Sequence, residues 1–267
     1  MALRAAVLAL SLLSLAACST APAPYTGPYW GADATATPGW GRLGEAALTA
    51  AADPFTWLPA ATAAGIQIGG ADDDIAEWAK EETPLFGARD TADDASDWLR
   101  VSSYAIYGAA GLAAPAPEDA WLATKAKGFA VGGGALLATW GATEGLKTAT
   151  GRERPIGRAD DSFPSNHASI TAAGARLARE TLRYHDLPPA ARLGSDIGLA
   201  GLVLATGWAR VEAGKHHPTD VLAGMALGNF LAVFASEAFL APATGDRLQL
   251  GVTAHEDGML LRLGLKF

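Results

Sequence analysis

Three short segments in the second half of the chain combine cations, histidines and a carboxylate at spacings that suit anion chemistry. The first, residues 147–155, carries Lys147, Arg152 and Arg154 around Gly151 and ends at Pro155. Basic residues near a helix C-terminus interact favourably with the helix dipole and with solvent. Taken alone, the first segment is therefore compatible with an ordinary helix end.

The second segment, residues 163–169, places a serine and a histidine at the expected start of a helix. Ser165 stands where an N-cap belongs, so the first free amide groups of the helix converge on one place and can bind an anion. His167, in the first turn, could deliver a proton to that anion. The alternative is a surface histidine that happens to lie near a cap.

The third segment contains Arg210 and, five residues further on, the run from His216 to Asp220. Pro218 is typical of a first helical position, and residues four apart across that start can meet. A carboxylate of Asp220 that accepts the Nδ1 proton of His216 would leave Nε2 free to attack. The alternative is a helix-start salt bridge. His217 is expected to point elsewhere and to cap or pack.

In this order, the three segments resemble the type 2 phosphatidic acid phosphatase superfamily, which also includes bacterial class A acid phosphatases and vanadium haloperoxidases. The family pattern is Lys-x6-Arg-Pro, then Pro-Ser-Gly-His, then Ser-Arg-x5-His-x3-Asp. The matching residues are Lys147, Arg154, Pro155, Pro164, Ser165, His167, Arg210, His216 and Asp220. The resemblance covers residues 124–224. Asn166 replaces the family glycine, which preserves a main-chain amide, and Ala209 replaces the serine, which removes a hydroxyl.

The resemblance implies a metal-independent phosphatase without a cofactor. His216, oriented by Asp220, would attack phosphorus, and His167 would protonate the leaving oxygen. The phosphate would be bound by Lys147, Arg154, Ser165, Asn166 and Arg210. The expected substrate is a phosphomonoester, either soluble or a lipid phosphate. An apolar groove beside His167, lined by Trp140 or Trp208, would favour lipid, whereas a small polar mouth would favour soluble esters.

Two other functions remain open at this point. A site that stabilises five-coordinate phosphorus also holds vanadate, so a vanadate-dependent haloperoxidase is one alternative. A non-catalytic envelope lipoprotein is the other, although the histidines and Asp220 are all present.

The N-terminus reads as an export signal. Arg4 precedes an apolar stretch that ends in Leu15-Ala16-Ala17-Cys18, which resembles a bacterial lipobox. Cys18 is the only cysteine, so a disulfide within the chain is excluded. We therefore expect a signal peptide over residues 1–17, lipidation at Cys18 and a position on the periplasmic side of the envelope. Ser19 after the cysteine favours the outer membrane.

The formal net charge of −8 argues against nucleic acid as a partner, so any anion must bind in a local pocket. Residues 18–44, rich in Pro, Thr, Gly and Ala, read as a tether, and residues 45–243 as the catalytic domain. The catalytic domain is predicted to be an all-α bundle of about six or seven helices, at residues 45–65, 72–82, 93–113, 118–148, 165–184, 195–211 and 218–241. The first of these is expected to be interrupted near Pro54 and Pro59.

The most apolar stretches, residues 128–143, 197–209 and 221–234, are shorter than the roughly 18–20 residues of a membrane span. The tail differs from the bundle. Residues 244–267 alternate apolar and polar side chains around Asp257-Gly258, which predicts a β-hairpin. Such a hairpin is expected to pack on the bundle or on a second copy in a homo-oligomer.

Overall fold

The computed structural model describes residues 27–157, 160–240, 248–255 and 258–265. The predicted signal peptide, residues 1–17, and the predicted lipidation site, Cys18, lie outside these ranges and stay predictions.

Helices make up most of the described chain, which confirms the predicted helical fold. The described part contains eight α-helices, one more than the upper predicted number. They are α2 (Trp40–Ala52), α3 (Pro54–Gly69), α4 (Asp72–Glu82), α5 (Arg89–Ala113), α6 (Trp121–Thr150), α7 (Asn166–Leu182), α8 (Pro189–Glu212) and α9 (Pro218–Phe239), with a 3-10 turn η1 (Glu118–Ala120) before α6.

The extra helix arises because residues 45–65, predicted as one helix with interruptions near Pro54 and Pro59, belong to two helices divided at Asp53. Pro59 lies inside α3 and does not interrupt it. The backbone of Asp53 is extended, with φ −65° and ψ 130°, and its side chain accepts a hydrogen bond from the amide of Phe55 at 2.9 Å. Pro54 then occupies the first position of α3, where its missing N–H costs nothing. The cap and the proline together start a new helix.

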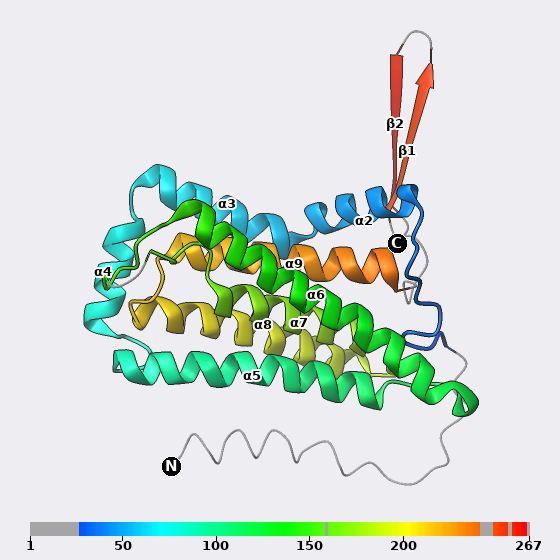
Figure 1. Ribbon diagram of the computed structural model, residues 1–267, viewed down its shortest axis with the longest axis horizontal. Helices are drawn as coiled ribbons and strands as arrows, with labels where there is room; N and C mark the ends of the chain where they lie inside the picture. The colour runs from blue at the N-terminus through cyan, green and yellow to red at the C-terminus, as the bar shows by residue number, and fades with distance from the viewer. Residues whose placement is uncertain (1–26, 158–159, 241–247, 256–257, 266–267) are drawn as a thin grey trace.

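Helix α7 is the centre of the bundle and packs against α5, α6, α8 and α9 (Figure 1). Its buried residues are mostly small, so its neighbours approach closely. The closest approach is at Gly228 in α9, where an added Cβ would lie 1.9 Å from the carbonyl oxygen of Ser169. Small residues therefore fix the distance between the two helices whose first turns carry chemistry.

The segment before α2 is part of the core, so the predicted tether, residues 18–44, extends too far. Trp30 is only 1% exposed, and its ring packs edge-on against those of Phe129 and Tyr107, at centroid distances of 5.0 and 6.1 Å. Burying so large an apolar surface stabilises the fold. In addition, α2 begins at Trp40, inside the predicted tether.

Helix α9 is long and apolar enough to cross a membrane, judged by length and composition only. The helix is longer than the apolar run of residues 221–234, which by itself is too short for a membrane span. In the structure, 56% of the most apolar window of α9 is buried inside the bundle. The core helix of a globular bundle has the same properties, because it is surrounded by other helices.

Two strands, β1 (Leu248–His255) and β2 (Gly258–Leu265), pair antiparallel at the C-terminal end, with His255 opposite Gly258 (Figure 1). They cover the residues whose alternation predicts a hairpin. That the hairpin packs on the bundle or on a second copy of the chain stays a prediction.

Candidate active site

The predicted site residues lie on segments that meet at one end of the bundle, the left end in Figure 1. At this end α6 and α8 finish, and α7 and α9 begin. Lys147 is in the last turn of α6 and Arg210 in the last turn of α8. The first turns of α7 and α9 and the loops before them supply Arg154, Ser165, Asn166, His167, His216 and Asp220.

His216 is 2% exposed, and its Nδ1 lies 2.7 Å from the main-chain oxygen of Ser162. A carbonyl oxygen can only accept, so Nδ1 carries the proton and Nε2 carries the lone pair. Burial, and next the positive charge of Arg210, hold the pKa of His216 well below 6.5, although Asp220 acts in the opposite direction. His216 is therefore a neutral imidazole with a defined tautomer.

The predicted hydrogen bond between Asp220 and His216 was wrong, because their closest atoms, Oδ2 and Nδ1, are 4.0 Å apart. The carboxylate of Asp220 is occupied elsewhere. It accepts hydrogen bonds from the Ser162 hydroxyl at 2.6 Å, from the His217 amide at 2.8 Å and from Arg152 Nη1 at 2.7 Å. At the third position of α9, it forms a capping box with His217. Asp220 thus reaches His216 through Ser162.

His217 is the N-cap of α9, as expected of a residue that caps or packs. Its Nδ1 lies 3.2 Å from Asp220 Oδ2. Burial raises the pKa of Asp220, but hydrogen bonds from His217 and Ser162 and the charge of Arg152 outweigh burial and lower it. Asp220 is therefore a carboxylate at neutral pH.

A second buried carboxylate, Asp72 at the start of α4, supports this arrangement and was not predicted. It accepts hydrogen bonds from the amide of Thr219 at 2.9 Å and from Arg152 Nη2 at 2.6 Å. Arg152 thus bridges Asp72 and Asp220, which ties α4 to the first turn of α9. The sequence shows Asp72 as one of three adjacent aspartates, and nothing in that run distinguishes the buried one.

Each cation predicted to bind phosphate has a carboxylate partner. Arg154 contacts Asp161 through Nε at 2.7 Å and through Nη2 at 2.8 Å. Lys147 lies 3.2 Å from Glu144 and 3.9 Å from the same Asp161. The guanidinium group of Arg154 and the ammonium group of Lys147 therefore both face the carboxylate of Asp161.

Arg210 is paired with Asp93 of α5 and also donates to the Ser96 hydroxyl at 3.0 Å. Burial lowers the pKa of Arg210, and the charge of Asp93 opposes that effect. Asp93 contacts Lys215 as well, at 3.0 Å. These α5 residues were not predicted, because they precede the three segments by more than 40 residues in the chain.

The N-terminus of α7 is capped by Ser165, whose hydroxyl accepts from the amide of Ala168 at 3.5 Å. Ser165 is fully buried, and its own amide donates to the carbonyl oxygen of Asp220 at 2.9 Å. Asn166 donates through Nδ2 to Glu144 at 3.1 Å. The predicted N-cap is confirmed, and phosphate contacts by Ser165 and Asn166 stay predictions.

His167 lies in the first turn of α7, with Nε2 2.8 Å from Asp97 Oδ1 of α5. Burial, and next the charge of Arg210, lower the pKa of His167 to about 4, while Asp97 raises it and Arg100 lowers it further. The sequence predicted His167 but neither α5 residue.

An apolar groove lies between α5, α6 and α7 and includes Asn166, the residue before His167. It has a volume of about 470 Å³. Trp140, one of the two tryptophans considered for a groove that would favour lipid, lines it. The other, Trp208, packs against Trp78 and donates to Glu212 at 2.5 Å. The groove is lined by Arg100, Tyr104, Leu136, Leu137, Trp140, Asn166 and Ile170.

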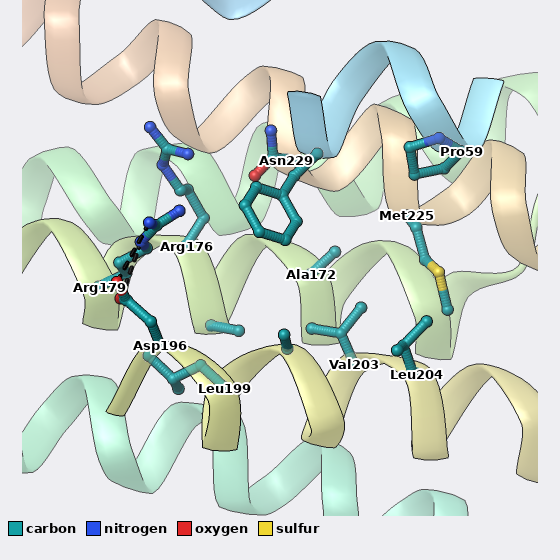
Figure 2. Close-up of a pocket in the computed structure, with 13 residues that line it drawn as sticks. Pro59, Ala172, Arg176, Arg179, Asp196, Leu199, Val203, Leu204, Met225 and Asn229 are labelled. Atoms are coloured by element: carbon teal, nitrogen blue, oxygen red, sulfur yellow. Dashed lines mark hydrogen bonds and ion pairs between the residues drawn. The ribbon is translucent and has the colours of Figure 1, made fainter. Parts of the chain in front are cut away.

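A separate apolar pocket of about 100 Å³ lies between α3, α7, α8 and α9 (Figure 2). Its charged and amide side chains form ion pairs and hydrogen bonds within the protein. Arg179 contacts Asp196 at 2.9 Å, Arg176 contacts Asp53 at 2.6 Å, and Asn229 donates to Asp53 at 3.0 Å. None of the three motif segments contributes a residue to the lining of this pocket.

Within the described ranges, no group of three or more His, Cys, Asp or Glu side chains could hold a metal ion.

Residues 127–241 match the family model of the PAP2 superfamily. This part of the chain is therefore similar to the PAP2 superfamily, whose members include phosphatases, which act on phosphate esters, and haloperoxidases. The match contains every predicted site residue except the lipidation site, Cys18. No curated protein and no solved structure matches the chain.

Proposed function

We propose that the protein is a metal-independent phosphatase that forms a covalent intermediate on Nε2 of His216. The observation that carries the proposal is the buried His216, which donates from Nδ1 to the Ser162 carbonyl and keeps its lone pair on Nε2. A nucleophilic histidine must be neutral and oriented, and burial together with this hydrogen bond favours both. The charges of Arg210 and Arg154 both act on His216, as a phosphate-binding site requires.

The reaction has two displacement steps. Nε2 attacks phosphorus, the P–N bond forms, and the ester P–O bond breaks as His167 gives its proton to the leaving oxygen. The Ser162 carbonyl stabilises the positive charge that develops on the ring of His216. Water then attacks the phosphoryl group, its proton passes to His167, and the P–N bond breaks to release inorganic phosphate.

Lys147, Arg154 and Arg210 supply the positive charge for the phosphoryl oxygens. When phosphate binds, its oxygens take the place of Asp161 on Arg154 and of Asp93 on Arg210. Arginine can hold two oxygens at once, so two guanidinium groups suffice to span the equatorial oxygens of the transition state.

The groove at Trp140 supports a substrate whose leaving group is apolar. Its lining is mostly aliphatic and aromatic, and Arg100 and Asn166 are its polar members. An acyl or isoprenyl chain would be removed from water there, whereas a small polar alcohol would gain little. We therefore favour a lipid phosphate over a soluble phosphomonoester.

The test is phosphate release in EDTA from p-nitrophenyl phosphate and from a phosphatidate in detergent, comparing wild type with His216→Ala. We expect wild-type activity on both substrates and loss of both in the variant. Activity that EDTA abolishes, or that survives in His216→Ala, would contradict the proposed chemistry.

A second variant tests the substrate class. Trp140→Ala removes groove surface without touching a proposed phosphate ligand, so kcat/KM should fall for phosphatidate and change little for p-nitrophenyl phosphate. An equal change for both substrates would refute the role of the groove in binding an apolar chain.

We further propose that the chain acts on the periplasmic side of the envelope, anchored through Cys18. The sequence around Cys18 supports this location. Labelled palmitate should be incorporated into the wild-type chain in bacteria and not into Cys18→Ser; equal labelling would exclude Cys18 as the acylated residue.

A further inference from the structure

Helix α5 contributes a carboxylate to His167 from outside the segment that matches the family model. Asp97 Oδ1 is 2.8 Å from His167 Nε2 and 2.9 Å from Arg100 Nη2. Asp97 and Arg100 are one helical turn apart, so the arginine keeps the carboxylate beside the histidine. One oxygen atom thus joins His167 to α5.

The surroundings of His167 oppose its protonation. The groups that act on it are Asp97 and Arg100 from α5 and Arg210 from α8. Burial and the two arginines lower its pKa, and Asp97 is the group that raises it. A neutral histidine cannot protonate a leaving group, so the proposed acid depends on this single carboxylate.

We propose that Asp97 is a positioning residue that favours the protonated form of His167 and fixes which of its ring nitrogens gives up the proton. The inference rests on the proposed phosphatase function. Because Nε2–H is donated to Asp97, the proton that reaches the leaving oxygen comes from Nδ1. The Nδ1–H bond breaks and the O–H bond forms. The neutral tautomer that remains still donates Nε2–H to Asp97.

The dependence of the rate on the leaving group separates this role from a structural one. An alkyl phosphate such as hexyl phosphate expels a strongly basic oxygen and needs the acid, whereas p-nitrophenyl phosphate expels a weakly basic one. We expect Asp97→Asn to reduce kcat/KM for hexyl phosphate about tenfold to a hundredfold and for p-nitrophenyl phosphate about threefold at most, given the usual size of general acid catalysis.

The control is Asp94→Asn, which removes the same charge from an exposed position on the same helix. It should leave both substrates unaffected. Asp97 itself has a side chain that is 57% exposed, and asparagine has the same shape, so the variant should fold. Thermal unfolding of both variants checks this.

The pH profile gives a second readout. Because His167 must be protonated, kcat/KM for hexyl phosphate falls as the pH rises through its pKa. Asp97→Asn should move this alkaline limb to lower pH, because it removes the charge that favours protonation, and Asp94→Asn should leave the limb in place. The ionisation of the substrate is the same in all three enzymes and cannot produce a shift in one variant alone.

Equal losses on the two substrates, no loss at all, or an alkaline limb that does not move would overturn the role of Asp97. Failure of the underlying function would look different, because the wild type would then release no phosphate or His216→Ala would retain activity.

Discussion

The orientation of His216 depends on a main-chain carbonyl, that of Ser162, and on the carboxylate of Asp220 only indirectly. The spacing of His216 and Asp220 correctly predicted that they share the start of α9. The spacing could not show whether the two side chains form a hydrogen bond. The carboxylate at the third position of a helix can instead accept from the N-cap amide, as Asp220 does from His217. A carbonyl acceptor such as that of Ser162 has no side-chain signal in a sequence.

Replacing Asp220 should therefore reduce stability as well as activity. In Asp220→Asn, Arg152 loses a partner buried inside the protein, and Ser162 and His217 lose a charged acceptor. Breaking a buried ion pair costs about 3–5 kcal/mol of unfolding free energy. We expect a clear fall in the free energy of unfolding by urea together with a fall in kcat. A stable but inactive variant would show that Asp220 acts on His216 alone.

Asp161 is expected to compete with phosphate for the cations. It contacts Arg154 and lies near Lys147, so a phosphate must displace it. Asp161→Asn should lower the inhibition constant of inorganic phosphate severalfold, by roughly 1 kcal/mol for a partly exposed ion pair. Asp160→Asn, an exposed neighbour, is the matched control. Weaker phosphate binding in Asp161→Asn alone would mean that Asp161 holds Arg154 in place for the substrate.

At the scale of elements, the close contact of α7 and α9 sets the distance between the first turns that carry His167 and Asp220. An added Cβ at Gly228 would overlap the Ser169 carbonyl, whereas one at Gly134 of α6 meets nothing within 4 Å. Gly228→Ala should therefore lower the unfolding free energy by about 1–3 kcal/mol, as overpacking does. Gly134→Ala should raise it by about 0.5–1 kcal/mol, because alanine favours helix.

Both changes are measurable by urea unfolding. A neutral Gly228→Ala would show that the two helices can separate at no cost. Phosphatase activity of the same variant would then report whether their spacing matters to the site.

The helices and the three motif segments were predictable because each is encoded locally, by periodicity, caps and breakers. The break before Pro54 was predictable too, because proline favours the first position of a helix. The predicted interruption at Pro59 was wrong, since Pro59 lies inside α3. The carboxylates of α4 and α5 at the site were missed. Asp72, Asp93 and Asp97 reach it through tertiary packing over 70 or more residues of chain, and no local pattern marks them.

For the whole molecule, burial and the combined charge of cations from different segments decide the pH at which the site works. The pKa values of both site histidines are lowered, that of His167 to about 4 and that of His216 well below 6.5. As the pH falls from 8 to 5, the protonated fraction of His167 rises. Burial and the charge of Arg210 oppose protonation of His216. Acidification therefore increases the amount of the proposed acid, while the surroundings of the nucleophile favour its neutral form.

We accordingly expect kcat/KM for hexyl phosphate to increase from pH 8 to pH 5, measured in buffers of constant ionic strength. An optimum at or above pH 8 would contradict the assignment of His167 as the acid. Circular dichroism at each pH controls for unfolding.

The contribution of α5 has a consequence for the divergence of such enzymes. The three motif segments fix the attacking atom and the cations, but the residue proposed to control the acid lies on a helix outside them. Substitutions along α5 could therefore change which alcohols are expelled efficiently while every motif residue is retained. Two proteins with identical motifs could then differ in selectivity, and comparing their motifs alone would not reveal it.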